Sequence, residues 1–282
     1  MTTEQHPSEP PQRAVVLGWP DSASGEQPRP AAPEAKPLPI GVQPMTRAQA
    51  LSAKRERELW DSRAESWDTT SAAGLSQVVA AVVEACEAAH SPVTLDIGCG
   101  SGQVTLPLAP SCAHVLAVDI SRPLLERLEA KARELGIENV KTVATPVEAL
   151  ELPHESLDLV VTNYALHHLR DADKELVLAR CMGWLRPGGR LVIGDMMFGR
   201  GSSVEDRTII TAKARAMLAR GPAGWWRLVK NIVLFSLRIR EKPMTAARWE
   251  AAVREAGYTD VQVRRIVAEA CVLTATKPLT TT

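Results

Sequence analysis

One short run constrains the fold of this chain more than any other: residues 95–102, with the sequence Leu-Asp-Ile-Gly-Cys-Gly-Ser-Gly. An apolar strand over residues 93–97 passes directly into Gly98, Gly100 and Gly102, and a helical stretch follows. Glycine lets the backbone turn tightly and lets a ligand approach closely. The start of a helix offers free N–H groups and the positive end of the helix dipole. The run therefore predicts a binding site for a nucleotide-like or anionic group.

The spacing of the glycines narrows the class of ligand. The dinucleotide-binding fingerprint has glycines at relative positions 1, 3 and 6. Here they occupy positions 1, 3 and 5, and Gln103 stands at position 6. A phosphate-binding P-loop needs a Gly-Lys-Ser/Thr sequence, and this loop has no lysine. An acidic residue before the first glycine, Asp96, is also unlike the dinucleotide pattern.

Around the glycine loop, short β-branched runs alternate with helical stretches. We expect strands at 93–97, 114–118, 140–144, 157–162 and 190–196, and helices at 104–109, 124–135 and 172–184. This alternation is typical of a parallel sheet with helices on both faces. Residues 159–161 and 191–193 are apolar throughout, as strands buried on both faces should be.

The chain divides into five expected parts. We expect residues 1–45 to form a disordered Pro-rich tail, because ten of the 20 prolines lie in residues 1–44 and little apolar surface is available for burial. Residues 46–90 form N-terminal helices, the first capped by Thr46 and running to about residue 65, the second over 74–89. The ligand-binding core follows at 91–198, a helical insert at 199–244 with helices at 204–219 and 223–240, and a closing part at 245–282 with a helix at 245–256 and strands at 261–267 and 271–275.

Composition argues against several classes of protein. Lys+Arg and Asp+Glu both number 33, which is unlike a globally basic nucleic-acid-binding protein. The five cysteines form no CxxC pair and no zinc-type cluster, so we expect no metal site, and a reducing cytoplasm fits them best. No apolar run approaches the ~20 residues that a membrane-spanning helix needs.

In the glycine loop and the segments that follow it, the sequence resembles the class I S-adenosylmethionine-dependent methyltransferases, of the ubiquinone/menaquinone-biosynthesis and natural-product type. The first motif of that family, Asp/Glu-x-Gly-x-Gly-x-Gly, is complete from Asp96 to Gly102. Segments 118–120, 147–150 with 156–158, and 185–189 match later motifs in order. The resemblance covers residues 60–198, and more loosely 245–277. It implies a doubly wound, Rossmann-like α/β sheet of seven strands, five of them parallel and closed by an antiparallel element, with a helical cap.

The resemblance also implies S-adenosylmethionine as the cofactor and a set of residues that bind it. Asp119, 23 residues beyond Asp96, would accept hydrogen bonds from the ribose hydroxyls. Trp67 would cover the methionine end or the mouth of the substrate site. The full expected set is Trp67, Asp96, Gly98, Gly100, Gly102, Asp119, Ile120, Val147, Glu148 and Asn163.

One residue departs from the family pattern at the loop that holds adenine. Many relatives have Asp or Ser before the residue pair equivalent to Val147 and Glu148, and this chain has Pro146. A proline side chain cannot accept a hydrogen bond from the adenine amino group. Adenine recognition then rests on the backbone of Val147, on Glu148 or on apolar packing.

The catalytic candidates follow the fourth strand, in residues 163–168. His167 or His168 could act as a general base near neutral pH. The alternative is a structural role for the pair, since His-His recurs here in relatives without catalysing the reaction. Tyr164 could contact the substrate or line its pocket. The Asn/Asp-Pro-Pro-Tyr signature of nucleobase and glutamine methyltransferases is missing, and a sulfonium methyl group needs positioning more than acid–base help.

The helical insert of residues 199–244 has three possible roles. Residues 196–250 carry 11 Lys+Arg and four Asp+Glu, and 223–240 read as a basic amphipathic helix with Trp225 and Trp226 at its start. It could be a lid packed on the sheet edge, a lid enclosing an apolar acceptor, or a peripheral membrane contact. We expect methylation of a small or medium-sized apolar metabolite at O, N or C. A membrane-associated lipid or prenylated-quinone methyltransferase and a non-catalytic cofactor-binding regulator remain alternatives, and the sequence leaves the oligomeric state open.

Overall fold

The computed structural model describes residues 39–86, 92–199 and 242–279, together with positions 207, 208, 211 and 215. Most of the expected tail therefore lies outside the described residues. So do Trp225, Trp226 and nearly all of the two expected insert helices. The four isolated positions within the first of those helices are helical.

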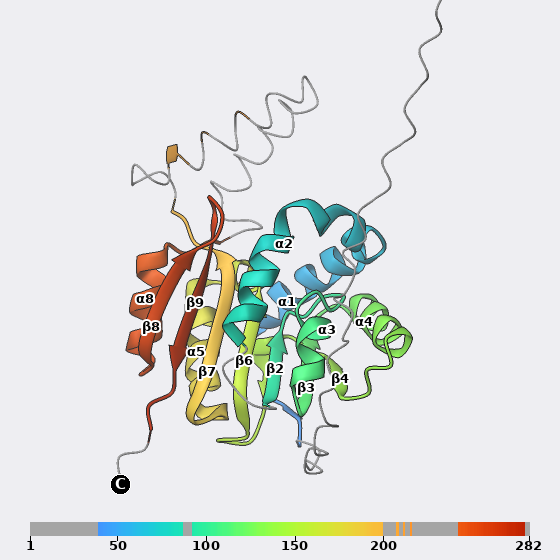
Figure 1. The fold of residues 1–282 in the computed structure, drawn as a ribbon, viewed down its shortest axis with the longest axis horizontal. Coiled ribbons are helices and arrows are strands. Elements are labelled where there is room, and N and C mark those ends of the chain that lie inside the picture. Colours follow the sequence, from blue (N-terminus) through green and yellow to red (C-terminus); the bar gives the residue numbers. More distant parts are fainter. Residues whose placement is uncertain are drawn as a thin grey trace, which may run out of the picture. The chain divides into compact units, whose positions relative to one another are not determined.

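A seven-stranded sheet organises the described chain, in the order β4-β3-β2-β6-β7-β9-β8 (Figure 1). Its strands are β2 (Val93–Ile97), β3 (His114–Asp119), β4 (Val140–Ala144), β6 (Leu157–Asn163), β7 (Leu185–Met196), β8 (Thr259–Arg265) and β9 (Ala270–Thr276). The pairings from β4 through β7 are parallel, while β9 is antiparallel to both β7 and β8. The prediction of five parallel strands closed by an antiparallel element is confirmed.

Helices cover both faces of this sheet. Val161 packs in one apolar cluster with α2 (Trp67–Cys86) and α3 (Thr105–Leu108). The preceding residue, Val160, packs on the other face with α5 (Asp171–Trp184) and α8 (Ala246–Glu255). Successive strand residues point to opposite faces, which explains why these strands are apolar at every position.

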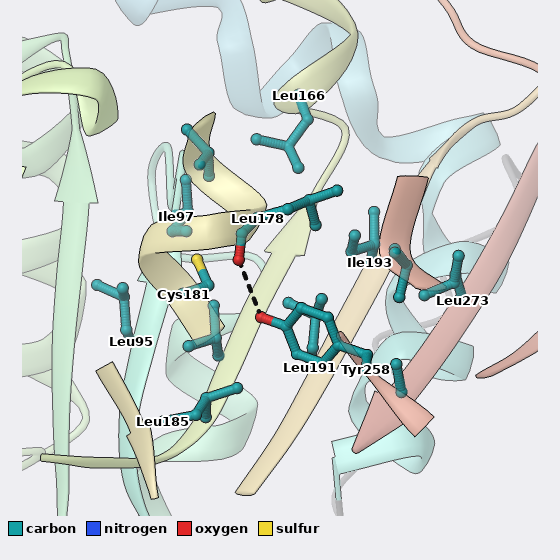
Figure 2. Close-up of a cluster of buried hydrophobic side chains, with 14 of the residues drawn as sticks. Leu95, Ile97, Leu166, Leu178, Cys181, Leu185, Leu191, Ile193, Tyr258 and Leu273 are labelled. Atoms are coloured by element: carbon teal, nitrogen blue, oxygen red, sulfur yellow. Dashed lines mark hydrogen bonds between the residues drawn. The ribbon is translucent and has the colours of Figure 1, made fainter. Parts of the chain in front are cut away.

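The core beneath α5 and α8 contains the buried hydroxyl group of Tyr258 (Figure 2). Tyr258, 3% exposed, lies among Leu178, Leu191 and Leu273, and its hydroxyl donates a hydrogen bond of 3.2 Å to the carbonyl oxygen of Leu178. The free energy cost of burying the hydroxyl is offset by this bond. Tyr258 thereby ties the start of β8 to α5.

The N-terminal part differs from its prediction in two places. Thr46 caps α1 (Arg47–Asp61) through a capping box with Gln49, as expected. However, the expected tail includes a strand, because β1 (Gly41–Val42) pairs antiparallel with β5 (Leu150–Glu151). The second helix starts at Trp67, not at residue 74, and ends at Cys86. Both errors have one cause: long-range pairing fixes segments whose local composition favours turns.

No helix among the described residues is both long and apolar enough to cross a membrane. The five cysteines are all buried as free thiols. In the described ranges no group of three or more His, Cys, Asp or Glu side chains is placed to hold a metal ion.

Candidate active site

A cavity opens where the carboxyl ends of β2, β3 and β6 meet. Ligands of open α/β sheets bind at this edge. Ten of the residues expected from the sequence line it: Trp67, Gly98, Gly100, Asp119, Ile120, Val147, Glu148, Asn163, Tyr164 and His168. Asp96 lines a smaller cavity that shares Trp67, Gly98 and Gly100 with the first. Gly102 and His167 line neither of these two cavities.

The glycine loop uses conformations that other residues adopt at a cost. Gly98, Gly100 and Gly102 have φ of +67°, +54° and +93°. A side chain on Gly98 would lie 2.3 Å from the Cβ of Ala165, and one on Gly100 would come within 3.4 Å of Trp67 Nε1. On one side the loop thus packs closely against the segment that follows β6, while its Gly100 face borders the cavity.

Asp119 at the end of β3 holds that loop in place. One carboxylate oxygen accepts a hydrogen bond from the Gly100 N–H at 2.9 Å, and the other accepts one from the Ser121 N–H at 2.9 Å. Burial raises the pKa of Asp119, while the N–H groups of Ser121, Gly100 and Ile120 oppose the rise and Asp61 adds to it. Each carboxylate oxygen has further lone pairs, so the group can accept hydroxyl protons from a ligand while it keeps the loop bonds.

Asp96 has a different environment, although it precedes the same loop. Its side chain is 1% exposed and accepts a hydrogen bond of 2.5 Å from the Thr105 hydroxyl. Burial raises the pKa of Asp96 to about 7; the Thr105 bond opposes the rise and the charge of Asp119 adds to it. A buried carboxyl that titrates near neutrality links the stability of this loop to pH.

We expect the contribution of Asp96 to the stability of the protein to fall as pH rises from about 4 to 7, because folded Asp96 holds its proton where the unfolded residue has lost it. The contribution is fully present below the ordinary pKa near 3.8 and lost as pH rises through about 7. Asp96→Asn should remove this component, so the difference in unfolding free energy between the variant and the parent should grow by a few kcal/mol across the interval. Urea titrations at a series of pH values measure it, and a constant difference would contradict the assignment.

The loop expected to hold adenine, in which Pro146 departs from the family pattern, is part of the cavity wall. Pro146, Val147 and Glu148 line it, and Glu148 is 8% exposed. Burial raises the pKa of Glu148 and the charge of Asp173 adds to the rise; Arg170 and Arg180 oppose it. A carboxyl group is thus available beside Pro146 for hydrogen bonding to a ligand.

Helix α1 supplies a wall that sequence reasoning missed. Ser52, Glu56 and Trp60 line the cavity, each four residues after the last. Their spacing of four residues could have indicated this wall from the sequence, since residues four apart share a helix face. Because the stripe mixes polar and aromatic residues, it does not read as a core face. The Asp61 carboxylate accepts a 2.6 Å hydrogen bond from the Ser121 hydroxyl, which docks the helix end beside Asp119.

Aromatic rings form a continuous row along this wall. Trp60 packs edge-on against Trp67 at 5.0 Å between ring centroids and against His168 at 5.1 Å. Tyr164 follows β6 with φ of +51°, a left-handed conformation that is uncommon for a residue with a side chain. Burial raises the pKa of Tyr164, so its hydroxyl acts as a proton donor and not as a base at neutral pH.

The two adjacent histidines have separate environments. His167 is 5% exposed; its Nδ1 lies 2.6 Å from one oxygen of buried Asp195, and its backbone N–H donates to the other oxygen at 2.9 Å. His168 lines the cavity, with its Nδ1 3.9 Å from Glu56 Oε2. The geometry favours a structural role for His167 and leaves His168 beside the cavity.

Replacing His167 with alanine should lower the unfolding free energy by about 2 kcal/mol, because buried Asp195 loses a hydrogen-bond partner and a void remains. Chemical denaturation measures the change. His154→Ala is the matched control, since His154 is exposed and its loss should leave stability nearly unchanged. Equal stability of the two variants would contradict the structural role.

Comparisons with known proteins find similarity to methyltransferases in the central part of the chain. The model of a methyltransferase domain matches residues 94–189. An uncharacterized methyltransferase of Mycobacterium bovis is 34% identical over 113 residues, which cover 40% of this chain and 55% of that protein. A second, of Bacillus subtilis, is 33% identical over 111 residues, covering 39% and 42%. The chain spans about half the length of the curated relatives it matches.

A solved structure resembles this fold over most of its length. The crystal structure of the 1,6-didemethyltoxoflavin-N1-methyltransferase of Burkholderia thailandensis has a TM-score of 0.59 and 21% identity. The likeness covers 88% of this chain and 98% of that one. That crystal contains 1,6-didemethyltoxoflavin and S-adenosylhomocysteine. At 21% identity this likeness shows that the two chains share a fold.

Proposed function

We propose that this protein transfers the methyl group of S-adenosylmethionine to a small or medium-sized apolar acceptor, since residues 94–189 match the model of a methyltransferase domain. The observation that carries the proposal is the single cavity shared by the glycine loop, Asp119 and the aromatic row of Trp67, Trp60 and His168. A carboxylate, the backbone of the glycine loop and aromatic side chains all line this cavity, at the carboxyl ends of the parallel strands.

The cavity residues fit this cofactor. The side-chain oxygen of Asn163 is buried, lines the cavity, and has no hydrogen-bond partner within the described part of the chain. An unsatisfied buried acceptor is costly, and a ligand donor group would remove that cost. Asp119 offers carboxylate lone pairs for the ribose hydroxyls, and Glu148 stands at the adenine-side loop. Gly98 and Gly100 allow backbone approach.

The chain's own residues would act by positioning and by excluding water. S-adenosylmethionine, when bound, supplies an electrophilic methyl group on a positively charged sulfur. Trp60 and Trp67 would shield that region from solvent, and Tyr164 would donate a hydrogen bond or line the acceptor site. Holding a nucleophile in line with the methyl group accounts for much of the rate enhancement expected here.

An apolar acceptor of modest size is supported by the cavity wall. Leu166 and Leu169 line it together with the aromatic row. The Burkholderia relative in fold has 1,6-didemethyltoxoflavin bound, an acceptor within the proposed size range. The insert of residues 199–244, proposed as the substrate cap, lies almost wholly outside the described residues.

Calorimetric titration tests the proposal. The full chain should bind S-adenosylmethionine and S-adenosylhomocysteine with micromolar affinity and should not bind NAD. Transfer of a labelled methyl group to molecules in a cell extract would then establish turnover. Binding without transfer to any extract would favour a non-catalytic regulator, and failure to bind either sulfur compound would overturn the cofactor assignment.

A further inference from the structure

The adenine loop, residues 146–150, is anchored by groups from outside it. Three consecutive carbonyl oxygens in the loop accept hydrogen bonds from other segments, those of Glu148, Ala149 and Leu150. Arg180 of α5 donates to two of them through one guanidinium nitrogen, to Glu148 at 2.7 Å and to Leu150 at 3.1 Å. The backbone N–H of Gln43 donates to the Ala149 carbonyl at 2.7 Å. Groups on α5 and on the segment after β1 therefore fix the backbone of this loop.

The same guanidinium group joins these two anchors. Its second terminal nitrogen donates a hydrogen bond of 2.7 Å to the side-chain oxygen of Gln43. Next to this contact, β1 pairs antiparallel with β5, and Val42 lies opposite Leu150. An arginine presents its N–H groups in a fixed plane, so one side chain can donate to acceptors on two chain segments at once. Arg180 thereby couples the adenine loop to β1.

The bonds inside the adenine loop close a turn but do not place it against α5. The N–H groups of Ala149 and Leu150 donate to the carbonyl oxygens of Pro146 and Val147, within the turn itself. Val147 and Leu150 also pack in the apolar core together with residues of α5. Because apolar packing is non-directional, the hydrogen bonds from outside the loop set the orientation of the turn.

Arg180 acts on the cavity only through this loop. Val147 and Glu148 line the cavity, whereas Arg180 is not among its lining residues. The residue whose carbonyl Arg180 binds, Glu148, also carries the carboxyl group at the cavity wall. Burial raises the pKa of that carboxyl, and the positive charge of Arg180 opposes the rise. Arg180 thus favours both the position and the ionised, accepting form of the Glu148 side chain.

We propose that Arg180 is a positioning residue that holds the adenine loop in place against the purine of the cofactor. The inference rests on the proposed methyl transfer from S-adenosylmethionine. Because Pro146 offers no side-chain acceptor, the 6-amino group of adenine would donate to the Glu148 carboxylate or to the loop backbone. These acceptors meet the amino group only while the loop keeps its orientation. A 6-oxo group would instead place oxygen against oxygen, so the site selects a 6-aminopurine.

Calorimetry with two ligands that differ at this position tests the proposal. S-adenosylhomocysteine carries the 6-amino group, and S-inosylhomocysteine carries a 6-oxo group in its place. The parent protein should prefer the first by at least about tenfold, the effect of one buried acceptor left without a donor. Arg180→Met should bind S-adenosylhomocysteine about tenfold more weakly and should lose most of the preference. General damage would instead weaken both ligands alike and leave the preference unchanged.

Arg186→Met is the matched control. Arg186 also donates to a backbone carbonyl, that of Glu155 at 3.2 Å, but it lies at the start of β7, at the opposite end of the strands from the cavity. The affinities of this variant for both compounds should equal those of the parent. Should Arg180→Met fail to fold, Arg180→Gln keeps a polar but shorter and uncharged side chain, and the same fall in preference is expected.

The outcomes separate this inference from the proposed function. A reduced preference in the Arg180 variant, with Arg186→Met like the parent, would establish the positioning role. A preference equal to that of the parent, or a parent that binds both compounds equally, would overturn it while leaving the proposed cofactor in place. A parent that binds neither compound defeats the proposed function, and amide hydrogen exchange then decides the anchoring. The N–H groups of Ala149 and Leu150 should exchange at least about tenfold faster in Arg180→Met, and unchanged exchange would count against Arg180.

Discussion

Replacing Asp119 with alanine should weaken the binding of S-adenosylmethionine by about thirtyfold. Charge-assisted hydrogen bonds to the ribose hydroxyls would be lost, with a free energy of binding on the order of 2 kcal/mol. The same change removes the acceptor for the N–H groups of Gly100 and Ser121. The glycine loop would lose its tie to the end of β3, so the loss of affinity includes a contribution from loop disorder. Calorimetric titration of the purified variant measures the effect.

A matched control separates ligand recognition from general damage. Glu138→Ala removes an exposed carboxylate and should leave affinity unchanged. Asp119→Asn keeps the shape of the side chain and one acceptor oxygen, and it should retain more affinity than Asp119→Ala. Affinity of Asp119→Ala equal to that of the parent would mean that the carboxylate has no part in binding the cofactor.

The sheet could be predicted from the sequence because its signal is local. Strands buried on both faces, such as residues 159–161, are apolar at every position, and the runs between them have helical spacing. The stop at Gly136 and the cap at Thr245 are likewise properties of single residues. Order along the chain, combined with the parallel connections, then leaves few possible topologies.

The N-terminal segments could not be placed in this way. Residues 41–42 form β1 because they pair with β5, and the Pro-rich sequence around them contains no pattern that predicts this pairing. The start of α2 is similarly held by distant groups: the Asp68 carboxylate accepts hydrogen bonds from Ser101 and Lys131. Contacts between residues this far apart in sequence produce no periodic pattern from which they could be predicted.

The same distinction divides the site. Gly98, Gly100 and Asp119 stand at fixed intervals after strands, so their motif predicts where they lie. Glu56 enters the cavity from a helix that the motif does not include, and its meeting with His168 depends on how α1 docks. The motif predicts the residues of the proposed cofactor side of the cavity, whereas those of the proposed acceptor side depend on tertiary packing.

Replacing Gly98 with alanine should lower the unfolding free energy by about 3 kcal/mol and abolish cofactor binding. A left-handed conformation costs a residue with a Cβ about 1–2 kcal/mol, and Gly98 has φ of +67°. The new Cβ would also lie 2.3 Å from the Cβ of Ala165. That distance is far inside van der Waals contact, so the loop or the segment after β6 must move, at a further cost of about 1–3 kcal/mol. Urea denaturation measures the sum.

Two further variants resolve that sum into its parts. Gly136→Ala is the matched control, because Gly136 has φ of +66° and nothing within 4 Å of a Cβ; it should cost about 1–2 kcal/mol, the conformational share alone. Adding Ala165→Gly to Gly98→Ala removes the overlap, so the double variant should be more stable than the sum of the two single changes predicts, by at least about 1 kcal/mol. Additive single changes would show that the close approach of the loop to Ala165 is not what excludes a side chain. In that case the conformation of Gly98, and not its packing against β6, would set the geometry of the cofactor loop.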